Sequence, residues 1–246
     1  MFPRIVLAPL LGLLISTTSA QEEIAPAQQQ SAIAKLSSQP GAEADRQILA
    51  LFDRLDAHDL PSACWLELLE AAAVRLDPAV KARLAAYEKS TNESRDALRR
   101  FRECVEGGDA ARGREIFLND PRAGCIRCHR VSGAGGEIGP DLTSVRQVTD
   151  RIFILESIVE PSTVITNGFP HVLLKLASGE MISGIAGFES SEEVLLISTI
   201  DGKRRRIRVA EITERTALPS AMPAGFGQIL GKRAVRDLVE FLATVE

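Results

Sequence analysis

The hydrophobic residues of this chain follow a helical period in its first half, alternate with polar residues later, and return to a helical period at the end. Over residues 42–106 apolar side chains recur every three or four positions, which is typical of amphipathic helices. Between residues 169 and 209 they alternate, as in strands with one buried face. A last helical stripe covers 232–245. The pattern therefore predicts a mainly α protein that is interrupted by a small antiparallel β-meander.

The first helical stretch predicts two or three antiparallel helices. Pro61 and Pro78 each follow the end of one apolar stripe and precede the next, and proline is favoured in the first turn of a helix. The preceding residues, 21–41, are rich in Gln, Ala, Ser and Pro, so we expect a flexible leader there. We interpret 42–106 as a short HEAT-like helical region that either binds a partner or packs against the rest of the chain.

The alternating segment predicts four strands. Its first run, with Val172, Leu174 and Leu176 on one face, would bury that face against the helices. Turn signals separate the runs, and Asp-Gly is a strong hairpin signal. The turn signals are Ser178-Gly179 and Asp201-Gly202. The other three runs cover 180–188, 193–200 and 203–209.

The start of the chain predicts export. Residues 1–20 read as a signal peptide, with an apolar stretch over 5–15 and a small-residue cleavage site at 18–20. That stretch is shorter than a membrane helix needs, although a retained anchor is the alternative. We expect a periplasmic or otherwise exported protein that is soluble after cleavage and contacts a membrane at most through an uncleaved signal. In an oxidising compartment Cys64 and Cys104 could form a disulfide, or they remain two separate, semi-buried thiols.

The charge balance disfavours nucleic acid as a partner. The formal net charge is −4, and removal of Arg4 with the signal gives −4 − 1 = −5. Arg204, Arg206 and Arg208 would share one face of the last predicted strand. They form either a docking patch for an acidic partner or a solvated strand edge whose charges prevent aggregation.

A Cys-x-x-Cys-His run, Cys125 to His129, is the chemically most informative motif. It is the attachment signal of a c-type haem, in which two thiols bond to the porphyrin vinyl groups and the adjacent imidazole ligates the iron. A zinc site is the alternative for so short a motif. Export favours the haem, because covalent attachment in bacteria occurs outside the inner membrane. We therefore predict one covalent haem c on Cys125 and Cys128, with His129 as an iron ligand.

The other axial ligand would be a methionine or a second histidine. Met222 is favoured because it precedes Pro223 in a loop before the last helix, and proline stiffens the backbone there. A His/Met pair raises the reduction potential. The alternative for Met222 is a core methionine, and His171 would be the partner in a bis-His pair. Met181 in a strand and His58 at a helix end fit the role less well.

Pro140 lies eleven residues after His129, which is about the distance a loop needs to return to the imidazole. Its carbonyl could accept a hydrogen bond from Nδ1–H and so fix the ring. Leu142 would then pack on the porphyrin face. The alternative is an ordinary Gly-Pro turn.

In their order, these motifs resemble a class I cytochrome c. The resemblance rests on Gly113 to Phe117, the Cys-x-x-Cys-His run, Gly139 to Leu142, the Met222-Pro223 loop and the last helix. It implies that Gly113 and Phe117 cross the last helix near Phe241. The long segment between Leu142 and Met222 is a departure from that family.

Residues 107–246 are more similar to the Planctomycete/Verrucomicrobial haem-binding domain family, which shares the run 139–143, a Pro-Ser helix stop at 161–162, strands and a Met-Pro loop. Its members often follow HEAT-like helices and are often fused to β-propeller dehydrogenase modules. The resemblance implies a cytochrome c domain over 107–246 with a β insert at about 163–215.

The expected function is electron transfer. The chain would be an electron carrier, not an enzyme, and would take single electrons from an exported dehydrogenase and pass them to an acceptor. It could also be the cytochrome subunit of a dehydrogenase complex. The alternatives are a haem-based enzyme or sensor with an open or displaceable sixth ligand, and a scaffold subunit that binds a partner.

Overall fold

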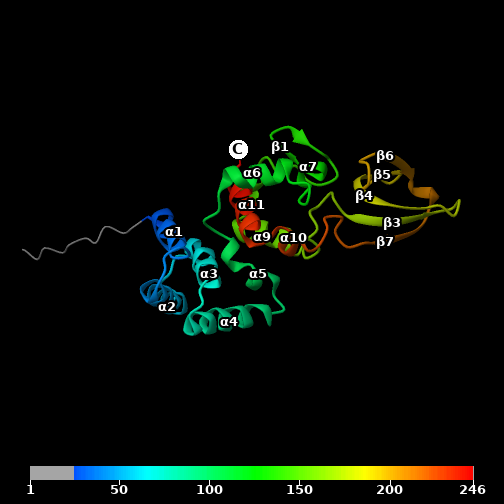
Figure 1. Ribbon diagram of the computed structural model, residues 1–246. Coiled ribbons are helices and arrows are strands. Elements are labelled where there is room, and N and C mark those ends of the chain that lie inside the picture. Colours follow the sequence, from blue (N-terminus) through cyan, green and yellow to red (C-terminus); the bar gives the residue numbers. More distant parts are fainter. Residues whose placement is uncertain (1–24, 246) are drawn as a thin grey trace, which may run out of the picture.

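The computed structural model describes residues 25–245, which form a helical bundle, a second helical cluster and a five-stranded antiparallel sheet whose sequence lies between helices of that cluster (Figure 1). The sheet lies at the opposite end of the molecule from the bundle. The expected signal segment, 1–20, falls outside the described residues. Among residues 25–245, no helix combines the length and the apolar character that crossing a membrane requires.

The bundle has its own apolar core. Ile48, Phe52 and Leu68 are almost completely buried in it, on the helix faces that the sequence pattern predicts. Asp77 caps the last bundle helix, since its carboxylate accepts the N–H groups of the first turn. The elements are α1 (Pro26–Lys35), α2 (Ala42–Asp56), the 3-10 turn η1 (Ser62–Cys64), α3 (Trp65–Ala73) and α4 (Pro78–Asn92).

Helix α1 corrects the expectation of a flexible leader over 21–41. The segment from Pro26 to Lys35 is helical, and Ile33 and Leu36 are each only 5% exposed in the bundle core. Proline at the start of the helix and the good helix formers Ala and Gln explain its formation. Two apolar residues one turn apart are enough to anchor it, although the overall composition is that of a linker.

The second cluster, called the helical core below, begins before residue 107. Ala97, Phe101 and Cys104 are buried in it together with Phe117 and Leu238. The boundary expected at 106/107 therefore does not coincide with a break in packing. The elements are α5 (Ala97–Arg100), η2 (Arg102–Cys104), α6 (Ala110–Asn119), α7 (Cys125–Cys128), β1 (Arg130–Val131), β2 (Ala134–Gly135), α8 (Val145–Val148), α9 (Arg151–Val159), α10 (Phe226–Leu230) and α11 (Lys232–Thr244).

Helices α6 and α11 cross in close contact. A Cβ atom on Gly113 would lie 1.9 Å from the Asp237 carbonyl oxygen, so only glycine allows this approach. One turn later, the rings of Phe117 and Phe241 pack with centroids 5.7 Å apart at an angle of 57°. The crossing of Gly113 and Phe117 with the last helix near Phe241 is thus confirmed.

The sheet contains the four expected strands and a fifth that the pattern did not predict. The order is β6-β5-β4-β3-β7, and each neighbouring pair is antiparallel. The last strand escaped prediction because its only large apolar residue is Ile212. The elements are β3 (His171–Leu176), β4 (Met181–Glu189), β5 (Glu193–Ile197), β6 (Arg204–Arg208), η3 (Val209–Glu211) and β7 (Ile212–Ala217).

The apolar face of the sheet is buried within the sheet itself. Val172, Leu174 and Leu176 pack against Val194 and Ile207 in a cluster separate from the helical core. The expectation that this face packs against the helices is therefore wrong. The sheet projects beyond the helices (Figure 1).

Candidate functional site

The Cys-x-x-Cys-His motif begins with a single helical turn, α7. Gly124 precedes it with φ +57°, a left-handed conformation that glycine adopts without strain. Cys125 and Cys128 are three residues apart in this turn, so they share one side of it, and both are free thiols. Burial raises the pKa of Cys125 to about 11 and also raises the pKa of Cys128. Both groups are therefore neutral thiols at physiological pH.

The His129 ring is held by the loop that follows it. Its Nδ1 lies 2.9 Å from the Pro140 carbonyl oxygen, as the spacing of eleven residues predicts. A Cβ on Gly139 would come within 2.6 Å of the ring atom Cε1, so the backbone of the loop packs directly on the imidazole. Burial lowers the pKa of His129, and the hydrogen bond to Pro140 opposes this shift. The ring is thus a neutral imidazole whose Nδ1–H donates to Pro140 and whose Nε2 carries a lone pair.

Backbone hydrogen bonds join the motif and its loop into one unit. A Cβ on Gly136 would lie 2.0 Å from the Arg127 carbonyl oxygen, so the two backbones are in close contact. Three N–H groups of the loop donate to carbonyls of the motif region: Gly136 to Ile126 at 2.9 Å, Gly139 to Cys128 at 2.8 Å and Leu142 to Arg130 at 2.8 Å.

Met222 packs on the same apolar cluster as this unit. Met222, Leu142 and Cys125 are all half-buried against the helical core. The N–H of Met222 donates to the Ser220 hydroxyl at 3.2 Å, which fixes the backbone of its loop. The structure therefore brings Cys125 of the motif, Leu142 of its loop and the predicted Met222 to one apolar cluster.

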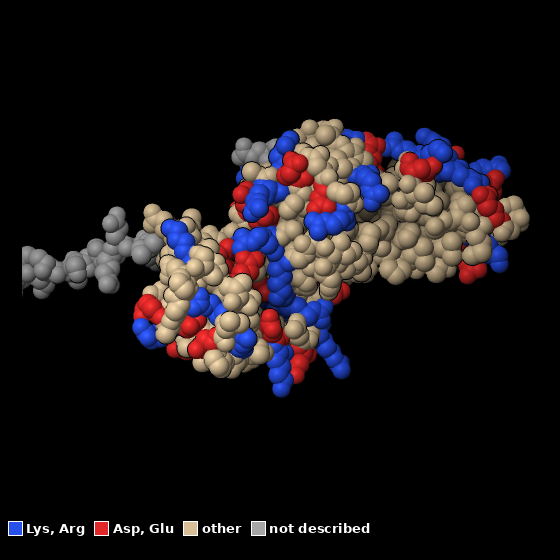
Figure 2. Space-filling view, viewed as in Figure 1, with Lys and Arg blue, Asp and Glu red and all other residues tan. Residues whose placement is uncertain are grey.

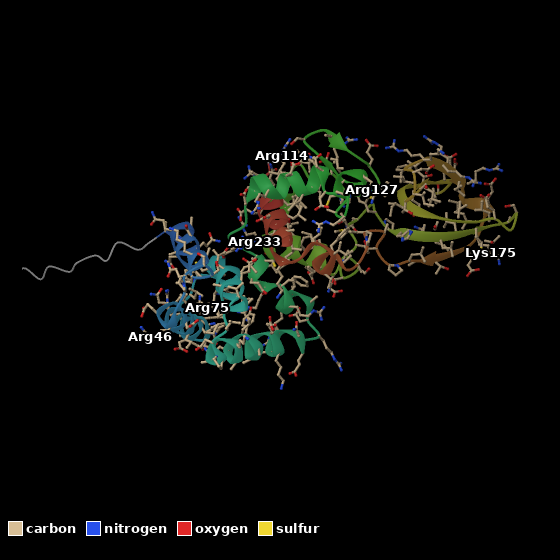
Figure 3. All side chains as sticks on the ribbon, viewed as in Figure 1. Arg46, Arg75, Arg114, Arg127, Lys175 and Arg233 are labelled. Atoms are coloured by element: carbon tan, nitrogen blue, oxygen red, sulfur yellow. The ribbon has the colours of Figure 1, made fainter. Side chains whose placement is uncertain are left out.

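The other ligand candidates lie elsewhere. Met181 is 61% exposed and pairs with Lys175, which stands at the far end of the sheet from Arg127 (Figure 3). His58 is exposed at the end of α2 with φ +58°. His171 begins β3 at the base of the sheet, where its Nδ1 lies 2.8 Å from the Pro219 carbonyl oxygen. Of the three, only His171 adjoins the loop of Met222.

The alternative of a zinc site lacks a ligand cluster. Within residues 25–245, no group of three or more His, Cys, Asp or Glu side chains is placed to hold a metal ion. A structural zinc needs four such donors in tetrahedral array. The thiols of Cys125 and Cys128 and the imidazole of His129 thus do not converge on a common point.

One contact between the sheet and the motif loop could not be read from the sequence. The carboxylate of Glu137 forms ion pairs with both Arg130 and Arg204, the first residue of β6. Beside this pair, a Cβ on Gly202 would lie 3.9 Å from Cγ1 of Ile138. The hairpin between β5 and β6 therefore touches the loop that carries Gly139 and Pro140.

The basic residues of β6 are neutralised by local partners. Positive and negative side chains are mixed along the upper right edge of the sheet (Figure 2). Besides Arg204, the paired side chains are Arg205 with Glu180, Arg206 with Glu193 and Arg208 with Glu211. This pairing favours a solvated strand edge over a docking patch for an acidic protein.

Cys64 and Cys104 are completely buried rather than semi-buried, and both are free thiols. They belong to different clusters, the bundle core and the helical core. Burial raises the pKa of each thiol. The structure thus agrees with two separate thiols and not with a disulfide.

Comparison with known proteins gives no further assignment: no family model matches the chain, and no curated protein matches it.

Proposed function

We propose that this protein is an exported mono-haem c-type cytochrome that transfers single electrons between redox partners. One observation carries the proposal: His129 bonds through Nδ1 to Pro140 directly beside a helical turn that presents two free thiols. This arrangement leaves Nε2 as the donor nitrogen and the thiols available for thioether bonds. Residues 107–246 would form a class I cytochrome c core with a β insert at about 163–215, a proposal that the crossing of α6 and α11 supports.

The residues present fit a covalent haem. Cys125 and Cys128 would attach it, and His129 and Met222 would be its axial ligands. Half-buried apolar side chains pack on the same cluster as Cys125, which suits the apolar face of a porphyrin. They pack against the helical core and comprise Ile126, Leu142, Val145, Met222 and Leu230.

The chain would control the site through orientation and polarity. When bound, the haem supplies a one-electron ferric/ferrous couple. Pro140 fixes the tautomer and orientation of the imidazole and makes it a stronger donor. A thioether donor from Met222 favours ferrous iron and raises the potential. Leu142 would pack on the ring and exclude water.

The partners follow from this role. An exported dehydrogenase would supply the electrons, and a second redox protein would accept them; the chain could equally be the cytochrome subunit of a dehydrogenase complex. A second candidate function is a haem-based enzyme or sensor, and it requires an open or displaceable sixth position. The contact of His171 with the loop of Met222 also keeps a bis-His pair as an alternative. If Met222 ligates the iron, the electron carrier is favoured over the enzyme or sensor and over a bis-His pair.

The absorption spectrum of the ferric protein tests the proposal. A weak sulfur-to-iron charge-transfer band at the red edge of the visible range is expected for Met ligation. Met222→Ala should remove the band, lower the potential and allow carbon monoxide to bind the ferrous form. Met181→Ala is the matched control, since that thioether lies on the exposed sheet, and it should change nothing. If His171→Ala had these effects and Met222→Ala did not, the assignment of Met222 would be wrong.

A further inference from the structure

The base of the sheet holds the loop of Met222 from one side. The N–H of Leu218 donates to the carbonyl of His171 at 2.9 Å, which continues the pairing of β3 with β7. The His171 side chain then reaches one residue further, with Nδ1 2.8 Å from the Pro219 carbonyl oxygen. Both the backbone and the ring of His171 therefore bind the segment that leads to Met222.

The turn that follows α9 holds the same loop through a second contact. The N–H of Ser220 donates to the hydroxyl of Ser162 at 3.2 Å, and the N–H of Met222 donates to the hydroxyl of Ser220 at 3.2 Å. A chain of hydrogen bonds thus links Ser162 through Ser220 to the backbone of Met222. The loop is fixed between the turn after a helix and the first residue of a strand, although residues 218–223 form no regular element themselves.

We propose that His171 is a positioning residue for Met222, and that the sheet thereby controls how firmly the methionine is held at the iron. The inference rests on the proposed function. It gives the sheet a role, because β3 and β7 together place His171 beside Pro219. Met222 can bind the iron only while its loop is in place. An added ligand therefore binds more tightly, in apparent affinity, when the loop spends less time in that position.

A histidine suits this position for a chemical reason. Its Nδ1 lies within hydrogen-bond distance of a carbonyl oxygen, as that of His129 does at Pro140. Asparagine offers an amide nitrogen at nearly the same place as Nδ1, but it cannot replace an imidazole as an iron ligand. The pair of variants His171→Leu and His171→Asn therefore separates positioning from ligation.

The test is a titration of the full-length ferric haem protein with imidazole, which competes with Met222 for the iron. Loss of one hydrogen bond from the loop should raise the apparent imidazole affinity of His171→Leu about fivefold to tenfold and weaken the sulfur-to-iron band. His171→Asn should return the affinity to within about twofold of the wild-type value. Lys175→Leu, on the same strand and face but at the far end of the sheet, should behave as wild type.

Ser162→Ala gives an independent reading, because it leaves the sheet unchanged and removes the other support of the loop. It should raise the imidazole affinity in the same direction, because it loosens the same loop. Wild-type affinity in folded His171→Leu would overturn the proposal. If that variant did not fold, wild-type affinity in folded His171→Ala would overturn it. Loss of low-spin iron in both His171 variants would also overturn it, since His171 would then be the ligand.

Failure of the proposed function would look different. A wild-type protein with covalent haem but no sulfur-to-iron band would refute Met222 as the ligand before any variant is made. A wild-type protein without haem would refute the cytochrome assignment itself.

Discussion

The bundle and the sheet are both joined to the helical core by an Arg–Glu pair, but the two pairs differ in burial. Arg236 of α11 forms a bidentate pair with Glu67 of α3 at 2.9 and 2.7 Å, and these side chains are only 3% and 6% exposed. Arg204 of β6 pairs with Glu137 of the motif loop, and those side chains are 53% and 47% exposed. The same chemical contact is therefore buried at one end of the molecule and solvated at the other.

The surroundings of the two pairs differ in the same way. Next to Arg236, Arg233 pairs with Glu70 between the core and the bundle (Figure 3), and Lys232 pairs with Glu103. Helix α11 thus packs one face on α6 and binds Glu67 and Glu70 of the bundle with another. The contacts of the sheet are smaller: the His171 ring lies against the loop of Met222, and Arg204 pairs with Glu137. We infer that the bundle supports the helical core, whereas the sheet is an excursion from it.

Deleting each region should give the largest effects. Removal of the bundle, 25–92, exposes to water the face of α11 that pairs with Glu67 and Glu70, so we expect little folded protein. Joining residue 162 to residue 216 by a short flexible linker removes β3 to β6 and most of β7. Because long loops add little closure entropy, shortening this connection should change the closure of the helical core little. That variant should fold with covalent haem, reduced stability and weaker Met222 ligation. Thermal unfolding followed by circular dichroism compares the two, and the opposite order of stability would contradict the comparison.

The buried pair should be costly to break. Glu67→Ala leaves the Arg236 guanidinium uncompensated, and its Nε atom already has no hydrogen-bond partner among residues 25–245. We expect a loss of about 3–5 kcal/mol in the free energy of unfolding, measured by urea denaturation. Glu70→Ala is the matched control because the pair of Glu70 with Arg233 is more exposed, and it should cost less than about 1 kcal/mol. Equal losses in both variants would show that burial does not decide the energy here.

The solvated pair should be nearly neutral. Arg204→Ala removes an exposed ion pair, which is worth about 0–1 kcal/mol and weakens further at high salt. Urea denaturation at low and high ionic strength measures it, with Arg206→Ala as the control on the same strand. A loss as large as that of Glu67→Ala would mean that the sheet is braced against the core and is not an excursion.

How far the sequence predicted these features depended on the range of the interaction. Local signals predicted α6, α11, the four strands and the contact between His129 and Pro140, because spacing along the chain determines them. The bundle contacts of α11 could not be predicted, since Glu67 and Arg236 are 169 positions apart. The contact of Glu137 with Arg204 was missed for the same reason.

Two expectations from the sequence were wrong for a physical reason, one about residues 26–35 and one about the sheet. Helix α1 was hidden by a composition typical of linkers, although Ile33 and Leu36 gave a weak apolar signal. The self-burial of the sheet was missed because alternation shows that a face is buried, but not what covers it.

The smallest expected effect is a dependence on pH at the contact of α11 with α6. The Asp237 carboxylate accepts the N–H of Asp109 at 2.9 Å, but burial is the larger influence and raises the pKa of this carboxyl. A carboxyl with a raised folded-state pKa adds stability at low pH and loses it as the pH rises through that value.

Wild-type protein should therefore lose stability relative to Asp237→Asn as the pH rises above 3.8, the ordinary value of the carboxyl. Urea midpoints at several acidic pH values check this slope, and a constant difference between the two proteins would contradict it.

The central claim is that Cys125 and Cys128 carry one covalent haem. The most direct measurement is the mass of the denatured protein, purified from cells with a working haem-attachment system. We expect the polypeptide plus one haem for the wild type, and a protein that loses its haem on denaturation when both cysteines are changed to serine. An unmodified polypeptide mass for the wild type would contradict the account.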